Sequence, residues 1–320
     1  MNPLVAIVGP TATGKSALGL ALAEALSGEI LACDSTAVYR GIDIGTDKVP
    51  VAQQRGIPHH LVDLVGPDEV FSAARYGREA GDIARAVHAR GHLPVIVGGT
   101  GLYYRALVRG IFPGPSRDDA LRARLERVAD RRGVEALHRW LTRVDEDSAR
   151  RIQPRDRKRL IRALEVYLLT GRSLTAHFSD TISPIADFDV MTIGLTMPRE
   201  ELRPRIARRV DQQFESGVVE EVRRLLEAGL PAAAHALSGL VYRQVMDMLR
   251  GVRNQADTRA LIVQENMRYA RRQSIWFRSE PVTHWIEGPG EGQAARDEAL
   301  HLTRRWLETR AAPEALTDLG

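Results

Sequence analysis

Residues 4–26 read LVAIVGPTATGKSALGLALAEAL, and this stretch decides the fold. The short apolar run over residues 4–8 predicts a buried strand, and the Ala- and Leu-rich run over residues 16–26 predicts a helix, which Gly28 is well placed to end. The turn between them fits the pattern G-x-x-x-x-G-K-[ST] at every position. Its residues are Gly9, Pro10, Thr11, Ala12, Thr13, Gly14, Lys15 and Ser16. This order of strand, turn and helix predicts a phosphate-binding loop.

The residue types in this loop suit an anion. Glycines let the backbone wrap a phosphate, so that N–H groups and the helix N-terminus face it. Lys15 adds a mobile positive charge, and the Ser16 hydroxyl is a candidate ligand for Mg²⁺. The 320 residues contain only three lysines, so a match by chance has a probability of roughly a few in a thousand.

The rest of the chain continues the pattern of strands alternating with helices. Residues 29–33, 94–97 and 191–195 predict further strands, and residues 73–89 predict a helix. We therefore expect an α/β fold of the P-loop NTPase-like type, with a parallel sheet flanked by helices.

A second region has helical periodicity only. Residues 118–171 follow a Pro-Gly-Pro turn and contain one internal break, at Pro154. We expect a core catalytic domain formed by residues 1–114 and 186–320, and an all-helical insertion domain formed by residues 115–185. From Pro198 the core continues as a long helical tail to residue 310.

The composition limits the cellular compartment and the binding partners that we expect. No apolar run reaches the roughly eighteen residues needed to cross a bilayer, and a single cysteine, Cys33, excludes an internal disulfide framework. We therefore expect a cytoplasmic protein without a membrane partner. Residues 117–172 hold 16 Lys and Arg against 10 Asp and Glu, whereas the whole chain has a net charge of only +4. This local excess favours contact with a phosphate backbone, although a solvated helical surface would have the same pattern.

Two further segments are candidates for the same site. The chain has no [NT]-K-x-D motif, with which a GTPase reads its base, so a GTPase is excluded. The strand at residues 94–97 is followed by Gly98, Gly99 and Thr100, whereas a motor ATPase usually has a metal-holding acid there. That loop suits a second close approach to an anion, or is a glycine-rich strand end without a ligand. Asp34 follows the strand at residues 29–33, at the sheet edge where such folds bind ligands. Asp34 either holds Mg²⁺ or accepts a proton from a nucleophile, or it only caps the N-terminus of a helix.

At this point the sequence resembles one family, the bacterial tRNA dimethylallyltransferases, also called tRNA isopentenyltransferases or IPP transferases. The resemblance covers most of the chain. It is carried, in order, by residues 9–16, 34–46 (DSTAVYRGIDIGT), 58–63 (PHHLVD), 97–103 (VGGTGLY), 159–167 (RLIRALEVY), 242–244 (YRQ) and 272–278 (RQSIWFR).

The resemblance implies transfer of the dimethylallyl group of dimethylallyl diphosphate to the exocyclic amine of the adenine 3′ to the anticodon, with release of diphosphate. Lys15, the loop amides, Mg²⁺ at Ser16 and an arginine would stabilise the leaving group. Arg205 resembles the family's diphosphate arginine, with Arg209 as the reserve candidate. Thr100 resembles a threonine near the diphosphate and the target base, and Asp34 is the expected proton acceptor.

The resemblance also implies contacts with the tRNA anticodon stem-loop, and we expect the enzyme to work as a monomer. The implied tRNA-binding residues are Asp34, Ser35, Thr36, Ala37, Thr100, Arg122, Lys158, Arg159, Leu160, Ile161, Arg162, Tyr242 and Arg243. The chain departs from the common family pattern at Ala37, Gln153, Arg155 and Val241, which bears on individual RNA contacts.

Three alternatives stay open on the sequence. A P-loop kinase of small molecules or nucleotides shares the phosphate loop, a prenyltransferase acting on free AMP shares the chemistry, and an RNA-binding module could carry a vestigial nucleotide site. His59 and His60 suggest a metal, but no third ligand has suitable spacing, so structural histidines are the favoured interpretation.

Overall fold

The computed structural model describes residues 1–112 and 114–311, which form two compact units. The first, called the core unit here, is Met1–Val108 with Pro184–Gly320; the second, the helical unit, is Arg109–Ser183. The sequence placed the insertion at residues 115–185, so the helical unit begins six residues earlier and ends two residues earlier than expected. In the described part of the chain, no helix combines the length and apolar character that crossing a bilayer requires.

The core unit is built on a six-stranded sheet with the order β3-β2-β4-β1-β5-β6. All five strand pairings are parallel, which confirms the expected parallel α/β sheet. The strands are β1 (Asn2–Val8), β2 (Gly28–Cys33), β3 (His59–His60), β4 (Leu93–Gly98), β5 (Phe188–Thr196) and β6 (His284–Glu287).

Two expectations about this sheet were wrong. The helical tail expected to run from Pro198 to residue 310 is interrupted by β6, which is short and has only Ile286 buried. Gly28 does not end the first helix but opens β2, where a Cβ atom would lie 2.9 Å from the Leu93 carbonyl oxygen. This glycine is needed because β4 passes close by.

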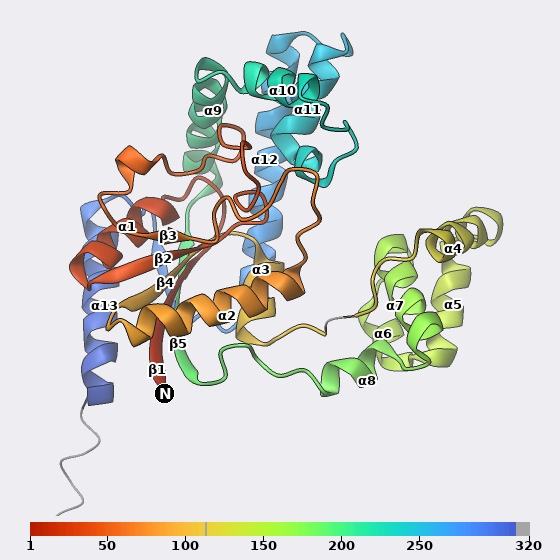
Figure 1. Cartoon of the computed structure of the whole chain (residues 1–320), viewed down its shortest axis with the longest axis horizontal. Helices are drawn as coiled ribbons and strands as arrows, with labels where there is room; N and C mark the ends of the chain where they lie inside the picture. Colours follow the sequence, from red (N-terminus) through yellow and green to blue (C-terminus); the bar gives the residue numbers. More distant parts are fainter. Residues whose placement is uncertain (113, 312–320) are drawn as a thin grey trace, which may run out of the picture. The chain divides into compact units, whose positions relative to one another are not determined.

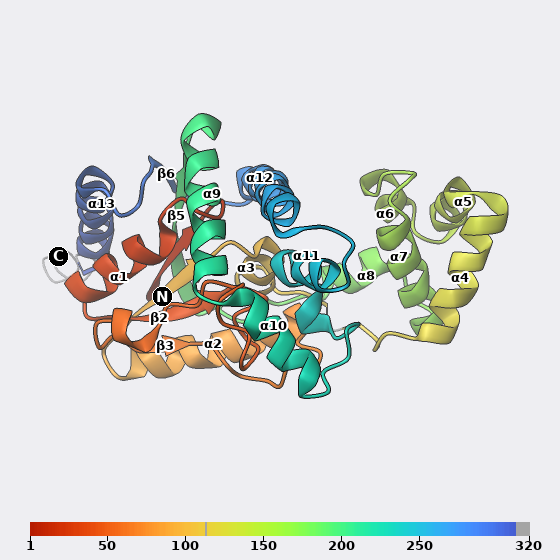
Figure 2. The same cartoon turned by 90° about the horizontal axis from the view of Figure 1, so that it is seen from above.

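Helices cover both faces of the sheet (Figure 1). Alternate residues of β1 point to opposite faces, so Leu4, Ala6 and Val8 belong to one hydrophobic cluster, and Val5 and Ile7 to another. The second cluster packs on α1 (Lys15–Ala25) and α13 (Gln293–Ala311). The first, larger cluster packs on α2 (Ala73–Ala89), α3 (Gly101–Val108) and the group α9–α12 (residues 199–278), whose members contact one another in sequence and are seen together in Figure 2.

The helices of the core unit are bounded as follows. They are α1 (Lys15–Ala25), η1 (Val51–Gln53), α2 (Ala73–Ala89), α3 (Gly101–Val108), α9 (Arg199–Glu215), α10 (Val218–Glu227), η2 (His235–Ser238), α11 (Leu240–Leu249), α12 (Gln255–Arg278) and α13 (Gln293–Ala311).

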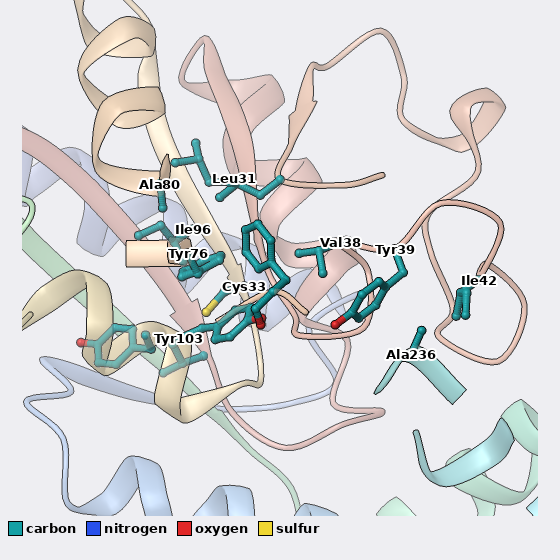
Figure 3. Packing of buried hydrophobic residues seen from close by; sticks show 14 of the residues in the cluster. Leu31, Cys33, Val38, Tyr39, Ile42, Tyr76, Ala80, Ile96, Tyr103 and Ala236 are labelled. Atoms are coloured by element: carbon teal, nitrogen blue, oxygen red, sulfur yellow. The ribbon is translucent and has the colours of Figure 1, made fainter. Parts of the chain in front are cut away.

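Tyrosines fill the larger cluster close to the carboxyl end of the sheet. Figure 3 shows Cys33 among buried side chains that include Tyr76 and Tyr103, whose rings stack with centroids 4.2 Å apart. Burial raises the pKa of the Cys33 thiol to about 12. The thiol is therefore neutral and serves as core, which leaves the oxygen and nitrogen side chains of the neighbouring loops for chemistry.

The helical unit has a hydrophobic core of its own. That core contains Leu125, Leu137, Leu141, Leu160 and Leu164. The five helices are α4 (Asp119–Arg132), α5 (Val134–Val144), α6 (Glu146–Arg151), α7 (Arg157–Thr170) and α8 (Leu174–Ser179), so the expected all-helical character is confirmed.

Candidate active site

Three loops meet at the carboxyl edge of the sheet because their strands are neighbours. β4 lies between β1 and β2, and Gly98 is level with both Val8 and Cys33. The loop after β1 holds the phosphate-binding pattern, the loop after β2 begins with Asp34, and the loop after β4 is Gly99 and Thr100. Parallel strands deliver their carboxyl ends to one edge, so segments far apart in sequence surround one space.

That space is a cavity of about 670 Å³ in the core unit. The loops contribute Thr11, Lys15, Ser16, Asp34, Ser35, Thr36, Ala37, Gly98 and Gly99 to its wall, and α9, α11 and α12 contribute Arg209, Tyr242, Arg243, Tyr269, Arg272 and Gln273. The expected neighbours Lys15 and Asp34 therefore face one cavity.

The phosphate loop has the backbone shape that its glycines predict. Gly9 and Gly14 have φ values of 138° and 89°, in a region that L side chains rarely adopt. A Cβ atom on Gly9 would also lie 2.5 Å from the Leu195 carbonyl oxygen of β5. Gly14 precedes α1 and gives that helix no side-chain cap, which leaves its positive N-terminal end available to an anion.

Lys15 is held inside the loop. Its Nζ donates a 2.6 Å hydrogen bond to the Pro10 carbonyl oxygen. Burial is the main cause that lowers the pKa of Lys15 to about 7; the nearby Arg209 charge lowers it further, and Asp34 opposes the shift. An anion in the cavity would favour the charged ammonium, so ligand binding and protonation of Lys15 are coupled.

Ser16 is the expected Mg²⁺ ligand. It is exposed at the start of α1 and lines the cavity. Mg²⁺ is commonly held by one or two protein oxygens together with phosphate oxygens and water, and the Ser16 hydroxyl fits that role. In residues 1–112 and 114–311, no three His, Cys, Asp or Glu side chains form a group that could hold a metal without such a ligand.

Asp34 does not cap a helix. Its Oδ1 accepts hydrogen bonds from the Thr36 backbone N–H (2.8 Å) and from the Thr36 hydroxyl (2.6 Å), which closes a turn. In the described part of the chain, Oδ2 has no hydrogen-bond partner. One carboxylate oxygen is thus fixed by the turn while the other is available to a ligand in the cavity.

Thr100 lies one layer behind the cavity wall. Its Oγ1 accepts a 3.1 Å hydrogen bond from the Ser35 backbone N–H, and its carbonyl oxygen accepts from the first turn of α3. Burial, followed by the Asp34 charge, raises the pKa of the Tyr269 phenol to about 12. Ser35 and Tyr269 line the cavity, and Thr100 orients Ser35.

The two candidate arginines of α9 differ in placement. Arg205 donates from Nε to the Ala12 carbonyl oxygen (2.7 Å) and pairs with Glu291, and it does not line the cavity. Arg209 lines the cavity, donates to the Thr11 hydroxyl (2.5 Å) and pairs with Asp47. The reserve candidate therefore has the position expected of Arg205.

Tyr242 contributes to the cavity wall but is committed to the protein. It is 1% exposed, and its hydroxyl donates to the buried Glu221 and accepts from the Gly45 N–H (3.0 Å). Glu221 also accepts from the backbone N–H groups of residues 43–45 and so fixes that loop. Arg243 is half exposed and pairs with Glu265.

In the helical unit, two of the expected RNA-binding arginines are paired with one buried carboxylate. Arg122 donates two hydrogen bonds of 2.8 and 2.9 Å to Glu165, which is completely buried, and Arg162 donates a third of 2.6 Å. Leu160 and Ile161 are core residues with 0% and 3% exposure, so their side chains do not reach a ligand.

Of the expected group at residues 158–162, Lys158 and Arg159 have exposed side chains. The charge pattern does not distinguish a basic side chain that faces solvent from one that pairs with a carboxylate of the unit.

The two adjacent histidines are structural in this environment. His59 Nδ1 lies 2.9 Å from the Ile57 carbonyl oxygen, and His60 Nε2 lies 2.6 Å from Glu29. Glu29 is buried and is also paired with Arg90 and His92. His60 therefore helps to anchor a buried carboxylate, and His59 contacts the backbone.

Sequence reasoning gave no role to Tyr269, Gln273 or Glu221. Gln273 was within the matched segment 272–278, which was a signal that the position matters but not of what it does. Tyr269 is four residues earlier and so shares the same helix face. Glu221 follows another glutamate on α10 and gives no sequence sign of being buried.

The sequence and the structure were compared with known proteins. Residues 37–280 match the family described as IPP transferase. The chain is 43% identical over 286 residues to the tRNA dimethylallyltransferase of Geobacter sulfurreducens, covering 89% of this chain and 92% of that protein. It is 45% identical over 288 residues to that of Thermomicrobium roseum, covering 89% and 86%.

Solved structures agree with these matches. The full-length tRNA isopentenylpyrophosphate transferase of Bacillus halodurans matches with a TM-score of 0.72 and 36% identity, over 97% of this chain and 98% of that one. A eukaryotic dimethylallyltransferase acting on tRNA has the same fold, with a TM-score of 0.78 at 23% identity over 97% and 80% of the two chains.

Proposed function

The chain belongs to the IPP transferase family, and we propose that its cavity joins dimethylallyl diphosphate to the exocyclic amine of the adenine 3′ to the anticodon of tRNA, forming i6A. One observation supports this assignment above the others: the phosphate loop and Asp34 line the same cavity. A leaving diphosphate and an attacking amine need these two kinds of group at opposite ends of one reaction.

The donor is bound through its diphosphate. Lys15, the N-terminus of α1 and Arg209 offer positive charge on one side of the cavity. We assign the arginine role to Arg209, because Arg205 holds the phosphate loop from outside at Ala12. Mg²⁺ held by the Ser16 hydroxyl and the diphosphate would supply further neutralisation of the oxygens.

In the transfer, the adenine nitrogen forms a bond to C1 of the dimethylallyl group and the C1–O bond breaks. The electron pair of the broken bond goes to the diphosphate, whose developing charge Lys15 and Arg209 stabilise. The new nitrogen bond makes the amine acidic, and its proton passes to the Asp34 carboxylate. Thr36 keeps the Asp34 carboxylate oriented through two hydrogen bonds to Oδ1.

The acceptor base has to leave its stack to enter this cavity, as is general for enzymes that act on bases. Ser35, Thr36 and Ala37 line the cavity beside Asp34, and Arg243 offers an exposed guanidinium. In the helical unit, Lys158 and Arg159 are the basic side chains of α7 that we assign to the RNA backbone of the anticodon arm. Such a protein would work as a monomer in the cytoplasm.

Among the alternatives, a kinase of small molecules and a prenyltransferase of free AMP are not supported by the family to which the chain belongs. A non-enzymatic RNA-binding module is equally at odds with it.

The test is a transfer assay with labelled dimethylallyl diphosphate, in which total tRNA, AMP and ATP are supplied as separate acceptors. We expect label in tRNA alone, at the adenine 3′ to the anticodon. The Asp34→Asn variant keeps an oxygen for Thr36 but loses the base, so turnover should fall about 10²–10⁴-fold at nearly unchanged donor affinity. Labelled AMP, or near-normal turnover by Asp34→Asn, would reject the proposed function or the proposed base, respectively.

A further inference from the structure

A buried glutamine connects two of the loops that meet at the carboxyl edge of the sheet. Gln273 is 6% exposed and projects from α12. Its Oε1 accepts a 2.8 Å hydrogen bond from the backbone N–H of Thr11, in the phosphate loop. Its Nε2 donates a 2.9 Å hydrogen bond to the carbonyl oxygen of Gly99, in the loop after β4.

The contact is tight on both sides. A Cβ atom on Gly99 would lie 2.2 Å from the Gln273 Nε2 and 3.2 Å from the Gly9 carbonyl oxygen, so only glycine allows this approach. The amide fixes the direction of both bonds, because its acceptor and its donor are on different atoms. One turn earlier on α12, Tyr269 lines the same cavity as Gln273 and Gly99, so one face of the helix is turned toward this edge of the sheet.

The Thr11 N–H has a consequence for the anion site. In a phosphate loop the backbone N–H groups normally turn toward the ligand. Here the Thr11 N–H is taken by Gln273, while the Thr11 hydroxyl accepts from Arg209. The tip of the loop is therefore shaped by residues of two helices that follow Thr11 by 198 and 262 residues.

We propose that Gln273 is a positioning residue that fixes the phosphate loop against the Gly99–Thr100 loop, so that donor and acceptor are held at reacting distance. This inference rests on the proposed transfer reaction. Gln273 acts on catalysis through Thr11 and Gly99. Its contribution is alignment of two bound reactants, for which an error of about 1 Å can cost about 10²-fold in rate.

Two substitutions separate this role from simple filling of the core. Gln273→Met keeps the length of the side chain and removes both hydrogen bonds. Gln273→Glu keeps the shape of glutamine. Its protonated carboxyl can accept a hydrogen bond from the Thr11 N–H and donate one to the Gly99 carbonyl oxygen. Its ionised carboxylate has no proton to donate to the Gly99 carbonyl oxygen. Burial raises the pKa of a carboxyl at such a site, so the protonated form grows as the pH falls. Gln264→Met, at an exposed position of the same helix, is the matched control.

We expect Gln273→Met to lower kcat by about 10- to 100-fold at every pH, with the KM for dimethylallyl diphosphate within a few-fold of wild type. Gln273→Glu should match it near pH 8 and recover at least about tenfold relative to it near pH 6. Each rate is divided by the wild-type rate at the same pH, so the titration of Lys15 cancels. A Gln273→Met enzyme with wild-type kcat, or a Gln273→Glu enzyme without recovery at low pH, would overturn the inference.

A second measurement does not depend on transfer. The Thr11 amide proton, observed by NMR, should be protected from exchange in wild type and Gln264→Met, exposed in Gln273→Met, and protected only at low pH in Gln273→Glu. If wild type failed to transfer label to tRNA, the proposed function would fail while the Thr11 signal would still test the contact. If Gln273→Met failed to fold, Gln273→Glu compared with itself at two pH values would decide the question.

Discussion

We expect Lys15 to make donor binding depend on pH, because its surroundings in the cavity lower its pKa. Its pKa is about 7 in the ligand-free cavity, because burial and Arg209 disfavour the ammonium. A bound diphosphate places negative charge beside the same group and raises its pKa, so binding above pH 7 takes up a proton. The direction is therefore fixed: affinity is highest where Lys15 is already charged, and it falls as the pH rises through 7 and beyond.

The magnitude follows from the fraction of charged lysine. With a pKa of about 7, half of the free enzyme carries the ammonium at pH 7 and about 1% at pH 9, so affinity should fall about 50-fold, or about 2.3 kcal/mol. The donor does not titrate in this range, since the last phosphate ionisation of such groups lies near pH 6.

The assay is calorimetric titration with dimethylallyl diphosphate in the absence of tRNA, from about pH 7 to about pH 9. Lys15→Arg carries a charge that does not titrate there, and Lys15→Met carries none, so both variants should give affinities that are flat with pH. Equal pH slopes in wild type and Lys15→Met would refute the coupling, and so would a wild-type affinity that does not change.

Three further outcomes are expected. Arg209→Gln should weaken donor binding and turnover together, by about tenfold or more in each, whereas Arg205→Gln should chiefly lower thermal stability; the same donor KM in both variants would contradict the assignment. Glu165→Gln leaves Arg122 and Arg162 without their buried anion and should destabilise the helical unit by about 3 kcal/mol in thermal or urea unfolding. Because the pKa of Glu165 is lowered to about 2, wild type should lose this stabilisation only as the pH falls from about 4.5 toward 2. Replacing both Lys158 and Arg159 by glutamine should reduce the slope of log tRNA affinity against log salt by about one to two, with donor affinity unchanged; an unaltered slope would exclude them as phosphate contacts.

Much of the fold could be predicted because its signals are local. The apolar run before Gly9 and the glycine pattern itself define a strand, a turn and a helix, and they correspond to β1 and α1. The order of strands is not local: β4 follows β2 and β3 in sequence but inserts between β2 and β1. β6 was missed because four residues with one buried side chain leave no period to detect.

The candidate site was predictable to the level of the sheet edge but not of the individual side chain. Asp34 could be placed beside the phosphate loop because parallel strands end together. Arg205 and Arg209 are four residues apart on α9 and face the same side, so only the height of the helix against the loop decides which one enters the cavity. Arg122 and Arg162 have the charge of RNA contacts, and their pairing with the buried Glu165 could not be read from the sequence.

The conformation of the phosphate loop in this protein depends on helices from elsewhere in the chain. Its backbone and side-chain groups at Thr11 are bound by Gln273 of α12 and Arg209 of α9, and Gln273 also binds Gly99 in the loop after β4. A change that displaces α12 must therefore disturb the phosphate loop and the neighbouring Gly99–Thr100 loop together. Because the reaction requires both reactants in one geometry, such a change reduces transfer more than it reduces the binding of either ligand. The helices that complete the cavity thus have a catalytic consequence even where their side chains touch neither reactant.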